Sequence, residues 1–497
     1  MANPPPKIRW AIFFGIALLA FAIRAPRLGE RPMHTDEAIN AYITGDLLAG
    51  KEYHYDPKDR HGPALYAVAL PIAKLAGPKN FAELTEVSVR VGPVIIGALG
   101  ILLFGFLVNR MGLLTSAIGA LLFAISPLPV YYSRDFIHET FFVAATLAFI
   151  ISVFRVVEYR SIKDGIFVGI GAGLMLACKE TTVIHFAAFG IAAMWWFWAT
   201  RPADKTQRDW QSAVKPGIAA FVSFCCVMVA LYTWWGRHWE GLLDLVHAIP
   251  HLASRAGGEG HEKPAWYYLA LLAGGWSGAG VIALAVWGAV SRREEIRSNK
   301  PLQALIVYTV TITALYSIIP YKTPWLALNL FLPLALLAGR GLANLWQAAR
   351  NSTTRAFTLL FAAALATALG HDTWRRVFVA PADERNPYAY AQTVDDILRL
   401  PERIRAVAGN NPSGNNLRIA VVAADPWPLP WYLRQFPNVG FWQPDQDPGK
   451  ADIYITSAEA SDKLGPLVKD WRTEFFGVRP EVLLVMWLPP EIKSNHD

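Results

Sequence analysis

Eleven apolar runs divide most of the chain, and they constrain its fold more than any other feature. They lie at residues 9–26, 86–108, 113–131, 136–157, 165–178, 181–199, 216–235, 265–290, 302–320, 324–343 and 356–371. A helix that crosses a bilayer needs about 20 apolar residues. The sequence therefore predicts a polytopic α-helical membrane protein with about 11 transmembrane helices. Because the run at 165–178 is short and could join the next one, the predicted number is uncertain by one or two.

The composition agrees with a membrane protein that carries some soluble mass. Of the 497 residues, 54% are hydrophobic and only 17% are charged, whereas soluble domains carry about 25% charged residues. These values exclude a disordered chain, a coiled coil and an ordinary soluble enzyme. The net charge of +7 does not require nucleic acid as a partner, since lysine and arginine crowd the cytoplasmic loops of membrane proteins.

Basic residues in the short loops predict the orientation of the chain. If the N-terminus is cytoplasmic, alternate loops are rich in lysine and arginine, and the loops between them are poor. With an odd number of spans, the C-terminal region then lies outside. We therefore expect a multi-pass protein of the inner (plasma) membrane with a cytoplasmic N-terminus and an extracytoplasmic C-terminal domain.

Two segments outside the membrane are large enough to carry structure of their own. Residues 1–371 form the predicted transmembrane domain, whose large first outer loop, 27–85, contains an apolar stretch at 64–76 that suits a helix at the membrane surface. Residues 372–497 form the second predicted domain. Tyr388 to Val407 has helical periodicity, and runs typical of β-strands follow at Leu417 to Ala424, Ala451 to Thr456 and Glu481 to Leu488. The pattern predicts a soluble extracytoplasmic α/β domain.

The first candidate site is the sequence from His34 to Glu37, shortly after the first span. Adjacent acids such as Asp36 and Glu37 can supply a general base or a metal ligand. The alternative is that they only cap the start of a helix, where the helix dipole favours negative charge.

Two further groups of charged residues lie at predicted outer ends of spans. Asp135 and Glu139 are four residues apart and share a helix face with His138 nearby, so this group could bind a divalent cation or simply begin a helix. Lys179 and Glu180 stand between two apolar runs with almost no loop, where ionisable residues are costly. Their alternative is a local ion pair of small value.

Cations on the same predicted side suit a phosphate group. Tyr321 and Lys322 occupy a short outer turn before a helix, a position that favours anions, although Lys322 could also reach along the helix to lipid headgroups. Arg90 and Arg134 add positive charge, and His61 adds a polar group from the first loop. A carboxylate base and a cationic clamp together suit a transfer reaction with a lipid-phosphate leaving group.

These residues give the chain a resemblance to the GT-C membrane glycosyltransferases. The Asp36–Glu37 pair after the first span is similar to the first-loop acidic signature of that superfamily. The stretches that also resemble it are Tyr53–Pro57, His61–Tyr66, Arg90–Pro93, Tyr132–Asp135 and Tyr321–Trp325. The nearest group is dolichyl-phosphate-mannose-protein mannosyltransferase-like and includes protein O-mannosyltransferases and lipid A aminoarabinose transferases. The combination of motifs, which covers about residues 8–345, also resembles a prokaryotic branch named for an archaeal flippase-associated activity.

The resemblance implies a GT-C-like fold and an inverting transfer of a sugar from a polyprenyl-phosphate donor, on the extracytoplasmic side. The acceptor would be a hydroxyl of a protein, glycan or lipid. Asp36 would be the catalytic base and Glu37 would orient it or bind acceptor. The implied donor and phosphate ligands are Arg90, Arg134, Asp135, Tyr321 and Lys322, and the other pocket residues are His34, His61, His138, Glu139, Lys179 and Glu180. No cofactor is required by this reading. A divalent cation stays open, with Asp36, Asp135 and Glu139 as candidate ligands.

Two other functions compete with this interpretation. A transporter or a component of a lipid-linked oligosaccharide flippase would place polar sites near the middle of the bilayer, often within internal repeats. Lys179–Glu180 is the feature that fits such a protein best, but no internal repeat is visible. A non-catalytic membrane scaffold would not need the acids and the cations to meet.

Overall fold

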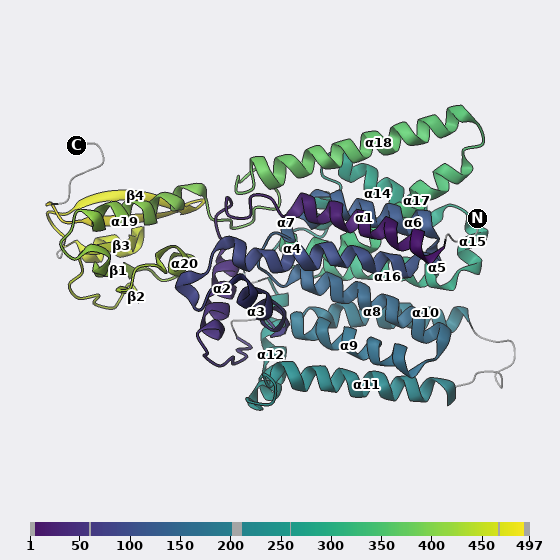
Figure 1. Ribbon diagram of the computed structural model, residues 1–497, viewed down its shortest axis with the longest axis horizontal. Coiled ribbons are helices and arrows are strands. Elements are labelled where there is room, and N and C mark those ends of the chain that lie inside the picture. The colour runs from purple at the N-terminus through teal and green to yellow at the C-terminus, as the bar shows by residue number, and fades with distance from the viewer. Residues whose placement is uncertain (1–4, 59–60, 201–210, 259, 466–467, 492–497) are drawn as a thin grey trace. The chain divides into compact units, whose positions relative to one another are not determined.

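The computed structural model of the protein describes residues 5–58, 61–200, 211–258, 260–465 and 468–491 (Figure 1). The backbone separates into two compact units. We call the first the helical unit, which comprises Met1–Pro26, Tyr53–Ala69 and Arg90–Val379, and the second the mixed unit, which comprises Arg27–Glu52, Leu70–Val89 and Ala380–Asp497. Segments of the predicted first outer loop therefore cluster with the C-terminal region.

Among the residues that the structure describes, eight helical segments are long and apolar enough to cross a membrane. They contain α1 (Pro6–Arg24), α4 with α5 (Glu86–Leu103 and Val108–Met111), α8 (Glu139–Tyr159), α10 (Thr182–Ala199), α11 (Gln211–Tyr232), α16 (Lys300–Ile318), α17 (Ala327–Ala348) and α18 (Ser352–Trp374). The shorter helices α6 (Leu113–Ile125), α9 (Ile162–Cys178) and α14 (Gly275–Val290) occupy the other predicted runs. The prediction of a polytopic helical membrane protein is confirmed, while the number of eleven crossings is not.

The long helices of the helical unit run side by side (Figure 1), and the segment that contains α17 is the most buried of the eight. In the apolar 18-residue stretch of the segment that contains α17, 94% of the residues are buried. The corresponding share is 17% in α1 and in α11. Helices α6 and α14 pack against α17. Peripheral helices such as α1 and α11 keep apolar side chains on the outside, as a bilayer requires.

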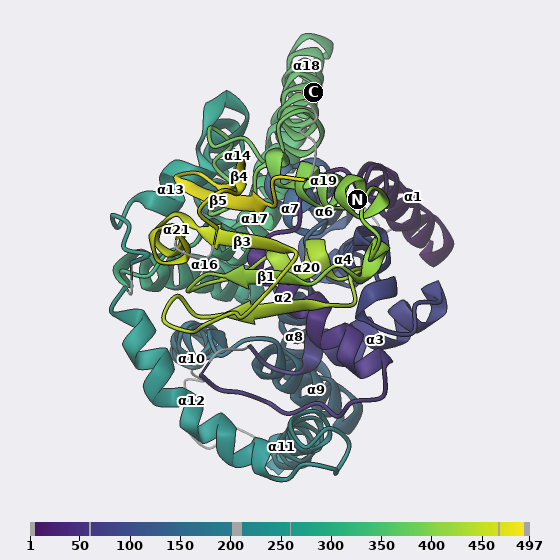
Figure 2. The ribbon, with the colours of Figure 1, turned by 90° about the vertical axis from the view of Figure 1, so that its left-hand side faces the viewer.

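Helix α12 (Glu240–Ala256) differs from the long helices in direction. It is seen along its length in Figure 2, where α11 is seen from its end, so α12 crosses the direction of the spans. Its exposed apolar side chains include Leu243, Val246 and Ile249. A helix with this apolar face suits the boundary between lipid and water.

The mixed unit contains a five-stranded sheet of order β2-β1-β3-β5-β4 (Figure 2). Its strands are β1 (Ile419–Val422), β2 (Val439–Trp442), β3 (Ile453–Ser457), β4 (Arg472–Arg479) and β5 (Val482–Leu488). Strand β1 is parallel to β2 and β3, and β5 is antiparallel to β3 and β4. The helices of this region are α19 (Arg399–Gly409), α20 (Leu429–Leu433) and α21 (Ala458–Leu464), and α21 covers a core that includes Val422 and Tyr454.

The predicted α/β character of the C-terminal region is confirmed, with two differences in detail. The three predicted strands are β1, β3 and β5, whereas β2 and β4 were not predicted. The helix expected from Tyr388 begins only at Asp395, with a 3-10 turn that leads into α19. Residues before it are held in an irregular path, since the N–H of Val394 donates to the carbonyl of Val478 at 2.9 Å.

The first-loop segments of the mixed unit pack on the C-terminal region through aromatic rings. Helix α2 (Thr35–Leu48) carries Tyr42, whose ring centre lies 5.2 Å from that of Phe81. Phe81 in turn lies 5.9 Å from Trp431 of α20. The indole N–H of Trp431 donates to Glu86 at 2.8 Å. Helix α3 (Ala64–Ala76) occupies the stretch where a helix was predicted, and its predicted position at the membrane surface stays a prediction.

Candidate functional site

The two acids of the first motif differ sharply in their surroundings. His34 is the residue before helix α2, and Glu37 is at the third position of that helix. The carboxylate of Glu37 accepts a hydrogen bond from the backbone N–H of His34 at 3.1 Å and lies 3.9 Å from the guanidinium of Arg31. Glu37 is fully buried, while the side chain of Asp36 is 49% exposed. The capping interpretation therefore accounts for Glu37, and Asp36 is the acid that a substrate can reach.

The ring of His34 is fixed through both of its nitrogens. Its Nδ1 accepts from the backbone N–H of Asp36 at 3.1 Å, and its Nε2 lies 3.2 Å from the carbonyl oxygen of Tyr390. These two bonds are satisfied together when the proton is on Nε2. His34 thus holds the backbone of Asp36 at the start of α2.

The C-terminal region holds the chain that leads into this motif. The hydroxyl of Thr393 donates to the carbonyl of Met33 at 2.7 Å, and the hydroxyl of Tyr432 accepts from the N–H of Met33 at 2.9 Å. The amide of Gln392 donates to the carbonyl of Pro32 at 3.1 Å. The C-terminal region therefore fixes the backbone that presents Asp36.

In the helical unit, Glu139 and Lys179 form a buried ion pair. Glu139 is the first residue of α8, and Lys179 directly follows α9. Both side chains are almost fully buried, at 3% and 5% exposure. An unpaired charge in this position would cost several kcal/mol, so the pair fixes the end of α9 against the start of α8.

Glu180 is held by two residues from the first-loop segment of the same unit. Its carboxylate lies 2.9 Å from Nδ1 of His61 and accepts from the hydroxyl of Tyr55 at 3.0 Å. Burial acts to raise the pKa of Glu180, but the charge and hydrogen bond of His61 and the bond from Tyr55 outweigh it and lower the pKa to about 2. Glu180 is therefore a permanent carboxylate that orders this segment.

His138 lies beside the same group. Its Nε2 is 3.1 Å from the carbonyl of Gly62, and its ring centre is 5.3 Å from that of His61. Burial, together with the neighbouring His61 and Lys179, holds the pKa of His138 well below its usual range. We call His61, His138, Glu139, Lys179 and Glu180 the polar cluster of the helical unit.

The predicted phosphate ligands of the helical unit are buried. Arg90 lies on α4, and Arg134 and Asp135 lie between α7 (Pro127–Tyr132) and α8. The guanidinium of Arg134 donates to the carbonyls of Arg24 and Pro26 and lies 4.8 Å from the ring centre of Phe378. Arg134 therefore holds the chain at the end of α1. Its place in the donor pocket stays a prediction.

Lys322 and Tyr321 lie in a short turn that pairs with the segment after α12. The N–H of Lys322 donates to the carbonyl of His261 at 3.0 Å, and the rings of Tyr321 and His261 are 4.9 Å apart. The ammonium of Lys322 donates to the carbonyl of Ile319 and is 1% exposed as a residue. Burial lowers the pKa of Lys322. A bound anion would offset this effect, because it favours the charged ammonium.

Comparison with known proteins supports the fold predicted from the sequence. Residues 75–234 match the dolichyl-phosphate-mannose-protein mannosyltransferase family. The crystal structure of ArnT from Cupriavidus metallidurans bound to undecaprenyl phosphate has a TM-score of 0.64 at 14% identity, and the match covers 99% of this chain and 100% of that one. This chain has the GT-C fold. No curated protein matches it by sequence.

Two other GT-C structures match over most of this chain. The archaeal oligosaccharyltransferase AglB from Archaeoglobus fulgidus, in complex with an inhibitory peptide and a dolichol-phosphate, has a TM-score of 0.60 at 13% identity, with 98% of this chain and 75% of that chain covered. The arabinofuranosyltransferase AftD from Mycobacteria has a TM-score of 0.51 at 14% identity, with 89% and 32% covered. These TM-scores support a shared fold, and at such low identities the substrate and the site residues have to be argued from this chain.

This chain also has a buried polar group that was not predicted from the sequence. His185 of α10 is fully buried, and its ring nitrogens lie 2.9 Å and 3.3 Å from the hydroxyls of Tyr308 and Tyr316 on α16. The amide of Asn329 donates to Tyr316 at 3.4 Å. A histidine inside an apolar run was the available signal, because an ionisable residue within a span needs a partner.

The three candidate metal ligands differ in whether their carboxylates are already bound or exposed. Glu139 is bound to Lys179, whose ammonium competes with a cation for the same oxygen. Asp36 is half exposed, and Asp135 is buried. Asp36 belongs to the mixed unit, whereas the other two belong to the helical unit. The divalent cation stays a prediction.

Proposed function

We propose that the protein is an integral-membrane glycosyltransferase that moves a sugar from a polyprenyl-phosphate-linked donor to an acceptor hydroxyl. The reaction takes place on the extracytoplasmic side and inverts the anomeric centre. The proposal is supported by the GT-C fold over nearly the whole chain and by the match of residues 75–234 to a mannosyltransferase family.

The observation that carries the proposal is the difference between Asp36 and Glu37. The carboxylate of Glu37 is bonded within the helix cap. Asp36 has an exposed carboxylate, and His34 and Thr393 fix the backbone that carries it. A general base needs both access to the acceptor and a defined position. Asp36 meets these two conditions, and Glu37 positions the helix on which Asp36 stands.

In the proposed reaction, Asp36 takes the proton of the acceptor hydroxyl as its oxygen attacks the anomeric carbon. The bond from that carbon to the phosphate oxygen breaks, and the polyprenyl phosphate leaves with the electron pair. The leaving phosphate gains negative charge, which a cation can stabilise in the transition state. Lys322 is the proposed cation, because its buried ammonium has a lowered pKa that a bound anion would restore.

The polar cluster of the helical unit has a supporting part in this scheme. Lys179 and Glu180 lie in the link between α9 and α10, at the ends of helices, and Glu139 and His61 neutralise them locally. A transporter site would instead be expected near the middle of the bilayer. The cluster is therefore proposed to fix the first-loop segment that carries Tyr55 and His61.

The experiment that tests the proposal follows the donor. Purified full-length protein in detergent is incubated with radiolabelled polyprenyl-phosphate mannose, arabinose or glucose and an extract of envelope acceptors, and free polyprenyl phosphate is measured. Release that depends on the protein and on acceptor supports the transferase. In vesicles that contain the protein, a flippase would move the lipid between leaflets without release of polyprenyl phosphate, and that result would replace the proposal.

A further inference from the structure

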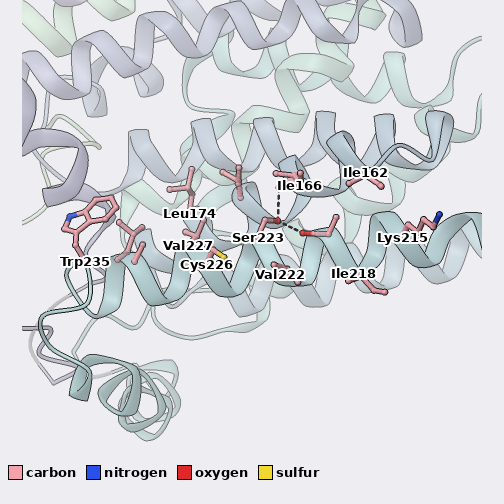
Figure 3. Close-up of a pocket in the computed structure, with 14 residues that line it drawn as sticks. Ile162, Ile166, Leu174, Lys215, Ile218, Val222, Ser223, Cys226, Val227 and Trp235 are labelled. Carbon is pink, nitrogen blue, oxygen red and sulfur yellow. Dashed lines mark hydrogen bonds between the residues drawn. The ribbon is translucent and has the colours of Figure 1, made fainter.

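An apolar groove of about 820 Å³ lies between α9 and α11, far along the chain from the acidic motif (Figure 3). Its lining includes Ile166, Leu174, Val222 and Val227, and Lys215 and Trp235 stand at its two ends. Most of the lining is apolar, as expected for a surface that faces lipid.

Close packing of the two helices produces the floor of the groove. A Cβ atom at Gly165 would lie 2.2 Å from the carbonyl oxygen of Pro216, and one at Gly169 would lie 2.0 Å from that of Ala220. Glycines at a spacing of four residues allow membrane helices to approach in this way. Ile162 and Ile166 of α9, each three residues before one of these glycines, then stand beside the line of contact and form one wall.

The polar atoms inside the groove are satisfied within the protein. The hydroxyl of Ser223 donates to the carbonyls of Ile166 and Ala219 at 3.0 Å and 2.8 Å. Lys215 differs, because among the residues that the structure describes no hydrogen bond or ion pair to its ammonium is found. A second cation is near its helix end, where Arg160 donates to Ser212 at 3.1 Å.

We propose that this groove binds an anionic phospholipid, with one acyl chain between α9 and α11 and the phosphate at Lys215. The apolar lining of the groove fits an acyl chain, and the exposed ammonium of Lys215 supplies a positive charge for the anionic headgroup. Trp235, at the other end, is 65% exposed and suits the lipid–water boundary.

Lys215 lies at the opposite end of α9 from the polar cluster. Because Pro216 packs on Gly165, Lys215 lies beside the first turn of α9. Lys179 and Glu180 follow the last residue of the same helix, about 25 Å away for 17 residues. A phosphate at Lys215 is therefore remote from the polar cluster, and the site does not depend on the proposed function.

Native mass spectrometry of the full-length protein tests the proposal. The protein is delipidated in detergent and titrated with phosphatidylglycerol or with phosphatidylcholine that has the same acyl chains. The wild type is expected to retain phosphatidylglycerol about fivefold more strongly. Lys215→Gln should remove this preference and leave the binding of phosphatidylcholine unchanged, whereas the control Lys450→Gln, at an exposed position between β2 and β3, should keep the preference. Val222→Trp, which fills the groove, should weaken the binding of both lipids.

Two results would overturn the inference. Equal retention of the two lipids by the wild type, or an unchanged preference in Lys215→Gln, would show that only non-specific lipid surrounds the groove. Displacement of phosphatidylglycerol by an equal concentration of polyprenyl phosphate, lost in Lys215→Gln, would assign the groove to the polyprenyl chain. Because Lys215 is exposed, its variant is expected to fold, and its elution as a monodisperse species confirms this before the titration.

Discussion

Nδ1 of His61 lies 2.9 Å from a carboxylate oxygen of Glu180, although 119 residues separate them in the chain. His61 lies within the predicted first outer loop, residues 27–85, and Glu180 lies in the link between α9 and α10. The contact ties a loop segment to the membrane helices through charge as well as packing. It also makes the stability of the helical unit depend on pH in a defined direction.

Glu180→Gln is expected to remove a stabilising effect that depends on pH. The pKa of Glu180 is about 2 in the folded protein and 4.5 in its ordinary state. Between these values the unfolded chain binds a proton that the folded chain does not, so stability falls as the pH drops through this window. The effect is full above about pH 4.5 and amounts to about 3 kcal/mol. Thermal unfolding of both proteins from pH 3 to 7 measures it.

The difference between wild type and Glu180→Gln should shrink toward acid pH. Glu402→Gln, an exposed acid on α19, is the control and should follow the wild type throughout. A difference that stays constant down to pH 3 would mean that the carboxylate of Glu180 is not stabilised by His61.

Lys179→Met is expected to destabilise the protein by about 3–5 kcal/mol, because it leaves the buried carboxylate of Glu139 unpaired. The double variant Glu139→Leu with Lys179→Met removes both charges and should recover much of that loss. Unfolding in denaturant after purification gives the comparison. If the double variant is less stable than Lys179→Met alone, the ion pair is not the main interaction between these two residues.

Lys322→Ala is expected to lower kcat/KM for the polyprenyl-phosphate donor by about 10-fold to 100-fold, since a hydrogen bond to a charged group contributes about 1.5–3 kcal/mol. Lys322→Arg keeps the charge but fits poorly in a buried turn, so it should recover only part of the activity. Lys300→Ala, at the far end of α16, is the control. Unchanged donor kinetics in a correctly folded Lys322→Ala variant would limit Lys322 to holding the turn through the carbonyl of Ile319 and move the search to Arg90.

Thr393→Val tests whether the C-terminal region positions the acidic motif. The substitution removes the donor to the carbonyl of Met33, and we expect a lower kcat with little change in donor KM. Thr393→Ser restores the hydroxyl and should rescue kcat, which a general loss of packing would not predict. Thr473→Val, at an exposed position of β4, is the matched control. Full activity in Thr393→Val would show that Asp36 is positioned without this bond.

The sequence predicted those parts of the fold that a bilayer dictates. Apolar runs of membrane length became α1, α8 and α16, because a helix satisfies its backbone polar groups within the segment, as lipid requires. Strand β2 was not predicted, because Val439–Trp442 is short and lies between turn residues. It is defined by its parallel pairing with β1, which the sequence does not show.

For the site, the sequence identified residue types but not their partners. Asp36 and Glu37 look equivalent in the sequence, and only the bond to His34 separates the buried cap from the exposed acid. The place of Arg134 in the donor pocket stays a prediction. The bonds from its guanidinium to the backbone carbonyls of Arg24 and Pro26 could not be predicted, because no side-chain pattern reveals them. His185 was missed because its partners, Tyr308 and Tyr316, lie more than 100 residues away.

The most direct test of the central claim compares sugar transfer by Asp36→Asn and Asp46→Asn. Both acids are on α2, and Asp46 is paired with Lys51 at 2.9 Å, away from the start of the helix. Each purified variant is supplied with the polyprenyl-phosphate sugar that the wild type uses, and the rate of release of polyprenyl phosphate is measured. We predict a loss of about 10²- to 10⁴-fold for Asp36→Asn, as expected when a general base is removed, and a rate near that of the wild type for Asp46→Asn. A wild-type rate in folded Asp36→Asn would contradict the assignment of Asp36 as the base.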